Sequence, residues 1–303
     1  MRDIIKYSVI IVTGLFMVTA CENAVPELNV VEVVAADYAF AVPDEIPSGW
    51  TTFLLNNEEA HEIHEISLAA IPEGKSYADY VNDFLTPWEI IWEQQQAGEV
   101  GMSAAEGFAA FMEIAPEWTA GVTYVTSRGL VSPGRSSSKI LYLEPGTYAI
   151  DCWVKAPDGT IHLSLGMTRE LIVTDEDSGE SEPESDIEIM LLDTGIEVNR
   201  ALTPGNHTIS VRIDEEMPYN NVHLIRMDEE TDLAEVTNWL NWYQEGGLQA
   251  PVPADFMGGV HTYGNIPYGD AAHFTVENIE PGEYAWVVES DVEEEYWKTF
   301  MVE

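Results

Sequence analysis

Three potential metal ligands lie close together near the middle of the chain. Cys152 is followed by nine residues and then by His162, and Met167 comes after four more. A thiolate and two imidazoles in a trigonal plane, with a long and weak axial methionine, form the ligand set of copper electron-transfer sites. The spacing therefore predicts a site for one copper ion, with the second histidine supplied by a distant segment.

The segment NNEEAHEIHEISL offers two candidates for that histidine, His61 and His64. We expect a strand to begin at His61. Side chains alternate between the two faces of a strand, so residues three apart point to opposite faces and only one can face Cys152. The segment resembles the cupredoxins, in which a ligand histidine sits at the end of an asparagine-rich turn; this resemblance favours His61, and His64 is the alternative.

An internal repeat gives a second argument about the same histidine. Aligning Leu68 with Met227 pairs His64 with His223 and His61 with Asn220. The second half has no cysteine that could match Cys152. A histidine that is replaced in that half is better explained as a ligand lost with the site, which again favours His61.

The strand that carries the cysteine is expected to point it inward. Tyr148, Ile150 and Cys152 share one face by alternation, and the segment 157–159, Pro-Asp-Gly, predicts a turn before His162. A single metal ion bound to Cys152 and His162 would then join the two ends of this loop.

The N-terminus has the features of a targeting segment. Arg2 and Lys6 precede an apolar run over 7–20, which is too short to span a bilayer as an ordinary helix. The run ends in Val-Thr-Ala-Cys at Cys21, which resembles the lipobox of bacterial lipoproteins. The resemblance implies that Cys21 is lipidated and anchors the chain in the cell envelope, and Glu22 after it favours the outer membrane. Cys152 would then be the remaining thiol, without a disulfide partner in the chain.

The charge balance narrows the range of partners. The chain has 303 residues, with 12 basic and 54 acidic side chains and a net charge of -42. Nucleic acid is excluded as an expected partner, since phosphate binding requires clustered lysine and arginine. The acidity fits a solvated surface in a salty medium, and it also fits a cationic redox partner steered by electrostatics. The two explanations are compatible.

Many short strands bounded by turns, and a motif that occurs twice, predict two similar domains. Leu143-Glu-Pro-Gly-Thr-Tyr148 is matched by Ile279-Glu-Pro-Gly-Glu-Tyr284, and helix-like stretches interrupt both halves. The expected units are a signal peptide 1–21, a tether 22–29, a domain 30–174 with the copper site, a flexible acidic linker 175–186, and a domain 187–303 without metal ligands.

The segment LEPGTYAIDCW, followed by a histidine and a Gly-Met pair, resembles the cupredoxins, the blue-copper proteins. The resemblance implies a mainly β fold of two cupredoxin-like Greek-key β-sandwiches, each with a short helical insertion. It implies that His61, Cys152, His162 and Met167 hold one copper ion for electron transfer or copper handling. The alternative is a metal-free binding or structural module on the cell surface, in which these residues belong to the core.

An enzyme is not expected. The sequence contains no Ser-His-Asp spacing, phosphate-binding glycine loop or paired-cysteine zinc pattern, and nothing suggests a second, open metal position. At most, the chain would be an electron-transfer subunit of a copper oxidoreductase.

Overall fold

The computed structural model describes residues 29–36, 38–57, 60–214, 221–261, 271–289 and 296–303. The expected signal peptide, lipidated Cys21 and most of the tether therefore lie outside the described residues. Within those residues, no helix has both the length and the apolar character that crossing a membrane requires.

The first half is a β-sandwich whose two sheets share one long strand. In strand β3, buried and less buried residues alternate along much of its length, as expected where one face packs on a core. One part of β3 pairs with β1 and β6, and its start pairs with β8, which continues the second layer as β8-β7-β4-β5. The strands are β1 Val30–Ala36, β2 Ala39–Ala41, β3 Glu45–Asn56, β4 Ser67–Ile71, β5 Thr123–Thr126, β6 Ser136–Leu143, β7 Gly146–Asp151 and β8 Thr168–Asp177.

The second half repeats this strand order. Its layers are β10-β9-β11-β14 and β13-β12-β15-β16, and β9 runs parallel to β11 as β1 runs parallel to β3. The strands are β9 Ile187–Leu192, β10 Gly195–Val198, β11 Gly205–Ile213, β12 Asn221–Arg226, β13 Asp255–His261, β14 Ala272–Ile279, β15 Gly282–Val287 and β16 Trp297–Val302.

The repeated Glu-Pro-Gly motif forms the same turn in both halves. It joins β6 to β7 and β14 to β15. The Tyr148 hydroxyl donates to the Glu144 carbonyl at 2.9 Å, and the Tyr284 hydroxyl donates to the Glu280 carbonyl, also at 2.9 Å. Each tyrosine thereby fixes the corner that precedes its strand.

Equivalent strands of the two halves pair with each other, so one sheet runs through the whole molecule. Strands β6 and β14 are antiparallel, with Ser137 opposite Val276 and Ile140 opposite His273. Counted back from the shared turn, Ser137 corresponds to His273 and Ile140 to Val276. The halves are therefore related by a local two-fold axis across this strand pair.

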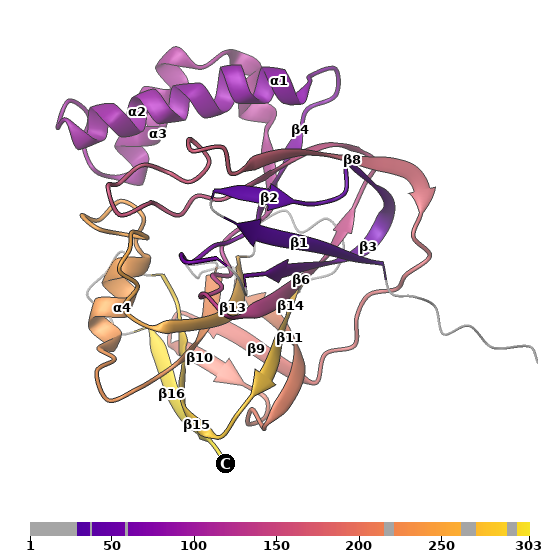
Figure 1. Ribbon diagram of the computed structural model, residues 1–303, viewed down its shortest axis with the longest axis vertical. Helices are drawn as coiled ribbons and strands as arrows, with labels where there is room; N and C mark the ends of the chain where they lie inside the picture. The colour runs from indigo at the N-terminus through magenta and orange to yellow at the C-terminus, as the bar shows by residue number, and fades with distance from the viewer. Residues whose placement is uncertain (1–28, 37, 58–59, 215–220, 262–270, 290–295) are drawn as a thin grey trace, which may run out of the picture.

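Each half carries a helical insertion at the same place in its strand order, between β4 and β5 or between β12 and β13. Ser76 and Ser103 cap the first insertion by accepting the backbone N–H groups of Asp79 and Glu106. The elements are α1 Tyr77–Tyr80, the π-turn Val81–Leu85, α2 Thr86–Gln96, α3 Ala104–Ile114 and the 3-10 turn Glu117–Gly121, with α4 Leu233–Leu240 in the second half. Helices α1 to α3 gather at one end of the first half (Figure 1). The predicted mainly β fold of two sandwiches with helical insertions is confirmed.

The acidic stretch 175–186 differs from the flexible linker that we expected. Its first three residues continue strand β8. Further along, Glu182 lies 3.3 Å from the His273 ring, and an Asp186 oxygen lies 2.6 Å from Nδ1 of His207. These contacts fasten the stretch to the second half, because its carboxylates find imidazole partners there.

His223 on β12 makes the stability of the fold depend on pH. It is fully buried, and neither ring nitrogen has a hydrogen-bond partner among the described residues. Burial, together with the charges of Arg128 and Lys139, lowers the pKa of His223 to about 3. Below about pH 6.5, His223 binds a proton in the unfolded chain but not in the folded one. The free energy of unfolding therefore falls by about 1.4 kcal/mol for each pH unit.

We therefore expect His223→Leu to reduce the loss of unfolding free energy between pH 7 and pH 5 by about 2 kcal/mol. Urea unfolding at the two pH values measures it. The control is Val222→Ala, which removes buried apolar volume from the neighbouring position and should lower stability equally at both pH values. Equal pH dependence of His223→Leu and the parent chain would contradict the prediction.

Candidate metal centre

Cys152 lies immediately after β7, at the start of the loop that leads to β8. Its side chain is fully buried, as the alternation of Tyr148, Ile150 and Cys152 predicted. The Cys152 N–H donates to the Met167 carbonyl at 3.1 Å, and its carbonyl accepts the Leu163 N–H at 3.0 Å. These backbone hydrogen bonds thus hold the two ends of the loop together without a metal ion.

The loop folds back on itself and brings His162 beside the cysteine. The His162 N–H donates to the Val154 carbonyl at 2.8 Å, and a turn that contains Gly159 reverses the chain between them. The Met167 N–H donates to the His162 carbonyl at 3.0 Å. Both His162 and Met167 are fully buried. The nine- and four-residue spacings therefore do bring these residues together.

His64 reaches the same place from a distant segment. It forms an isolated β-bridge with Val131, in which each N–H donates to the other residue's carbonyl, at 3.2 and 2.9 Å. The Asn57 side chain also donates to the Val131 carbonyl, at 2.7 Å, and to the Glu62 carbonyl, at 2.9 Å. These bonds fix the segment on both sides of His64, whose side chain is 1% exposed.

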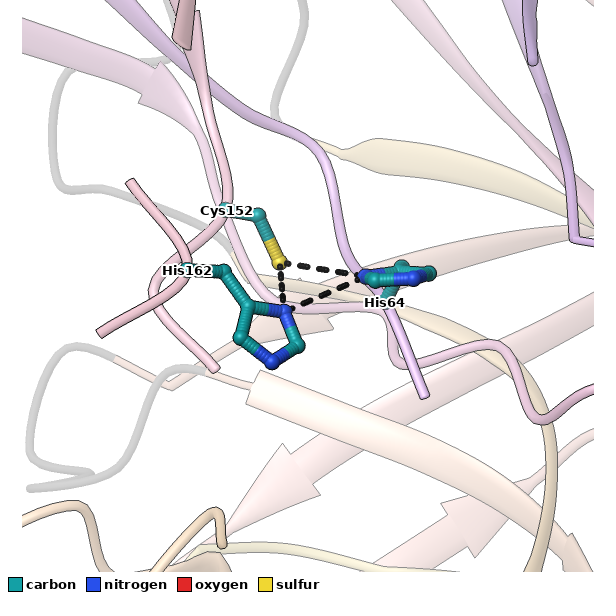
Figure 2. A group of neighbouring side chains, drawn as sticks. All are labelled: His64, Cys152 and His162. Atoms are coloured by element: carbon teal, nitrogen blue, oxygen red, sulfur yellow. Dashed lines mark hydrogen bonds between the residues drawn. The ribbon is translucent and has the colours of Figure 1, made fainter. Parts of the chain in front are cut away.

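The three donor atoms form a compact triangle (Figure 2). The Cys152 sulfur lies 3.8 Å from His64 Nδ1 and 3.6 Å from His162 Nδ1, and the two nitrogens lie 3.2 Å apart. Metal–nitrogen bonds of about 2.0 Å and metal–sulfur bonds of about 2.3 Å, as in zinc proteins, give a trigonal plane with edges of about 3.5 to 3.8 Å. The observed triangle has nearly that size, so these residues fit one metal ion.

Burial keeps both imidazoles in the form that can bind a metal. It lowers the pKa of His64 to about 3, with a further contribution from His162. Burial also lowers the pKa of His162, although Glu62 opposes this effect. Burial and the charge of Glu65 raise the pKa of Cys152, opposed by hydrogen bonds from the backbone of Glu65 and Val154. A metal ion must therefore displace the thiol proton but no imidazolium proton.

Two side chains that sequence reasoning missed orient His162. Its Nε2 lies 2.9 Å from a Glu62 oxygen, and the other Glu62 oxygen accepts the Tyr38 hydroxyl at 2.8 Å. The Tyr38 ring also meets the His162 ring edge-on, with centroids 4.9 Å apart. A proton on Nε2 shared with Glu62 leaves the Nδ1 lone pair for the metal. Nothing in the sequence pattern separates Glu62 from the other acidic residues around it.

The preferred first ligand, His61, requires correction. His61 is exposed and lies outside the group of donors, whereas the alternative, His64, belongs to it. The expected strand does not begin at His61, because β4 starts only at Ser67. The segment before Ser67 is irregular, so alternation along a strand could not decide which histidine faces the cysteine.

The alignment of the two halves explains the second error. Ser67 lies opposite Asp151, and His223 lies opposite Val287. Asp151 and Val287 each come three residues after the tyrosine of the repeated turn, so His223 corresponds to Ser67. The ungapped alignment was therefore three residues out of register.

In the corrected register, His64 corresponds to Asn220, which itself lies outside the described residues. His61 corresponds to Met217 in this register, so both histidines are replaced in the second half, and the loss of ligands does not decide between them. Val288, which is fully buried, stands where Cys152 stands in the first half.

No protein-family model matches the chain, and no curated protein matches it. Among solved structures, it is similar to auracyanin from Roseiflexus castenholzii, with 16% identity over 48% of this chain and 97% of that one and a TM-score of 0.28. Auracyanin A from Chloroflexus aurantiacus, a blue copper protein, shows 18% identity over 48% and 98% with a TM-score of 0.29. The copper-containing nitrite reductase of Thermus scotoductus shows 10% identity over 90% and 61% with a TM-score of 0.23. These superpositions are weak, and the site is interpreted from its own geometry.

The described part of the chain has one His-Cys-His site with a neighbouring methionine, of the kind typical of type 1 copper. We expect His64→Ala to abolish the visible absorption of the copper-loaded chain, because it removes one corner of the donor triangle. His61→Ala, three residues away and exposed, is the matched control and should keep the full spectrum. Absorption spectra after addition of Cu(II) test both variants, and the reverse pattern would contradict the assignment of His64.

Proposed function

We propose that His64, Cys152 and His162 would hold one copper ion, with Met167 as a weaker fourth ligand, and that the chain carries electrons. The observation that supports this most is the buried triangle of one sulfur and two nitrogens, with edges between 3.2 and 3.8 Å. A bound copper ion would supply reversible one-electron chemistry, for which this ligand set suits both oxidation states.

The surrounding residues support a rigid site. The ligand-bearing segments are held by backbone hydrogen bonds at Val131, at Val154 and between Cys152 and Met167. Glu62 holds the His162 ring by a hydrogen bond to Nε2 of that ring. Ligands held in one position need little rearrangement when the charge of the ion changes, and the hydrogen bonds made to these ligands tune the reduction potential.

The burial of the donors favours a carrier over an enzyme. All three donor residues are at most 1% exposed, and the Tyr38 and Glu62 side chains cover the outer edge of His162. Substrate would have no direct approach to the ion from that side. Glu62 is 23% exposed on its side chain, so it links His162 to the surface. We infer that electrons pass between the site and a partner protein near Glu62.

The charge and the N-terminus suggest where this happens. With a net charge of -42, the chain would attract a cationic redox partner, more strongly at low ionic strength. Lipidation of Cys21 would hold the protein in the bacterial cell envelope, with the outer membrane favoured by Glu22, and would keep the carrier close to a membrane-bound partner.

Copper titration of the mature full-length chain tests the proposed function. We expect one equivalent of Cu(II) to bind with an intense visible sulfur-to-copper band, which Cys152→Ser removes while the fold measured by circular dichroism persists. Binding of Cu(I) alone would point to copper storage or delivery instead of electron transfer. Absence of copper binding in the folded parent chain would support the metal-free module.

The contact between Glu62 and His162 can be tested by substitution. We expect Glu62→Gln to keep the visible band but to weaken Cu(II) binding by about tenfold or more, since an uncharged partner makes His162 a poorer donor. The reduction potential should rise, because a negative charge that stabilises Cu(II) is lost. Glu188→Gln, the same charge change on an exposed residue of the second half, is the control. Identical potentials for the two variants would contradict this role of Glu62.

The anchor is tested separately. We expect Cys21→Ser to yield either a soluble mature protein or an unprocessed precursor, since no thioether to lipid can form. Partitioning into detergent, compared with the parent chain, measures the effect. Unchanged partitioning of a mature-sized variant would contradict lipidation.

A further inference from the structure

A pocket of about 430 Å³ lies between the helical insertion of the first half and the segment after α4 in the second. This volume is in the range of small-molecule sites. Half of its lining residues are aromatic: among them, Phe84, Trp88 and Phe111 come from the first insertion, and Trp242 and Tyr243 follow α4. The helical insertions of both halves thus contribute residues to one cavity.

The pocket reaches the immediate neighbours of two metal ligands. Glu65 follows His64, Trp153 follows Cys152, and both line the pocket. A Glu65 oxygen accepts the Trp153 backbone N–H at 3.2 Å, which ties the two segments together at this point. A molecule in the pocket would therefore contact residues one position away from His64 and Cys152.

The indole of Trp153 supplies an unused hydrogen-bond donor. Its Nε1 is buried and has no acceptor among the described residues. The ring meets two other pocket residues edge-on, with centroids 6.3 Å from Tyr124 and 6.4 Å from Trp242. A buried N–H without an acceptor costs about 1 to 3 kcal/mol, which a ligand oxygen could recover.

The charges around the pocket disfavour anions. Glu65 is fully buried, and the nearby Arg128 guanidinium already lies 3.2 Å from a Glu289 oxygen. The net charge of -42 adds to the repulsion. Aromatic walls, a free donor and no free cation at Arg128 together select a neutral ring system that carries an acceptor oxygen.

We propose that this pocket is a binding site for a neutral aromatic compound with a carbonyl oxygen, which accepts the Trp153 Nε1–H while its rings pack between the insertion and the segment after α4. This site is separate from the metal ligands, and its existence does not depend on copper.

Three matched naphthalenes test the proposal by calorimetry on the mature full-length chain, with and without copper. The probe is 2-acetylnaphthalene, a neutral ketone. 2-Ethylnaphthalene has the same ring without an acceptor, and 2-naphthoate has the same ring with a negative charge. We expect the ketone to bind several-fold tighter than the hydrocarbon, since one added hydrogen bond contributes about 1 kcal/mol, and the carboxylate to bind weakest.

Two variants locate the binding. Trp153→Phe keeps a ring but removes the donor, so it should weaken binding of the ketone about fivefold and leave binding of the hydrocarbon nearly unchanged. Ala120→Trp places a large side chain at an exposed position of the pocket wall, where folding should tolerate it, and should weaken binding of both. Trp50→Phe, on β3 away from the pocket, is the control.

The result that supports the proposal is this full pattern in protein whose circular dichroism matches that of the parent chain. Equal affinity for ketone and hydrocarbon, binding unaffected by Ala120→Trp, or carboxylate binding as tight as ketone binding would each overturn it. A parent chain that binds the ketone but no copper would contradict only the proposed function. A parent chain that binds copper but not the ketone would contradict only the proposed pocket site.

Discussion

The structure depends on gathering three electron-pair donors in the core, where each lies within hydrogen-bonding distance of the other two. A thiol and two imidazoles with at most 1% exposure meet at one point. Burial lowers the pKa of His64 to about 3 and raises that of Cys152, so the neutral forms of both groups are favoured. A cation bound at the centre would satisfy all three donors together. The β-sandwich holds the donors in place by backbone bonds that do not require the ion.

The two halves share most of their architecture and differ at the position of the cysteine. Strand order, the tyrosine-fixed turn and the position of the helical insertion are the same in both. At the position of Cys152 the second half has Val288, which fills the core without a donor. The two halves are joined by a continuous sheet through β6 and β14 and share a core that includes Ile225 and Trp239. The second half thus contributes to the packing around the first, although none of its described residues belongs to the group of donors.

The part of the site that could be predicted from the sequence is the part whose geometry follows from local spacing. A cysteine at the end of a strand, a Pro-Asp-Gly turn and a return to the next strand bring Cys152, His162 and Met167 together through local bonds. Sequence reasoning failed where the geometry comes from irregular backbone: His64 lies on an isolated bridge to Val131, before β4 begins, so neither alternation nor an ungapped alignment could find it. Glu62, Tyr38 and the aromatic pocket arise from contacts between distant segments, which no local pattern encodes. The acidic stretch gained partners, His207 and His273, for the same reason.

The most direct measurement of the central claim is a crystal structure of the copper-loaded mature chain with anomalous data collected on both sides of the copper absorption edge. We predict a single strong copper peak inside the triangle formed by His64 Nδ1, His162 Nδ1 and Cys152 Sγ, with the Met167 sulfur as the next nearest donor. A copper peak at His61, at His223 or on the acidic surface, with no density inside the triangle, would contradict it.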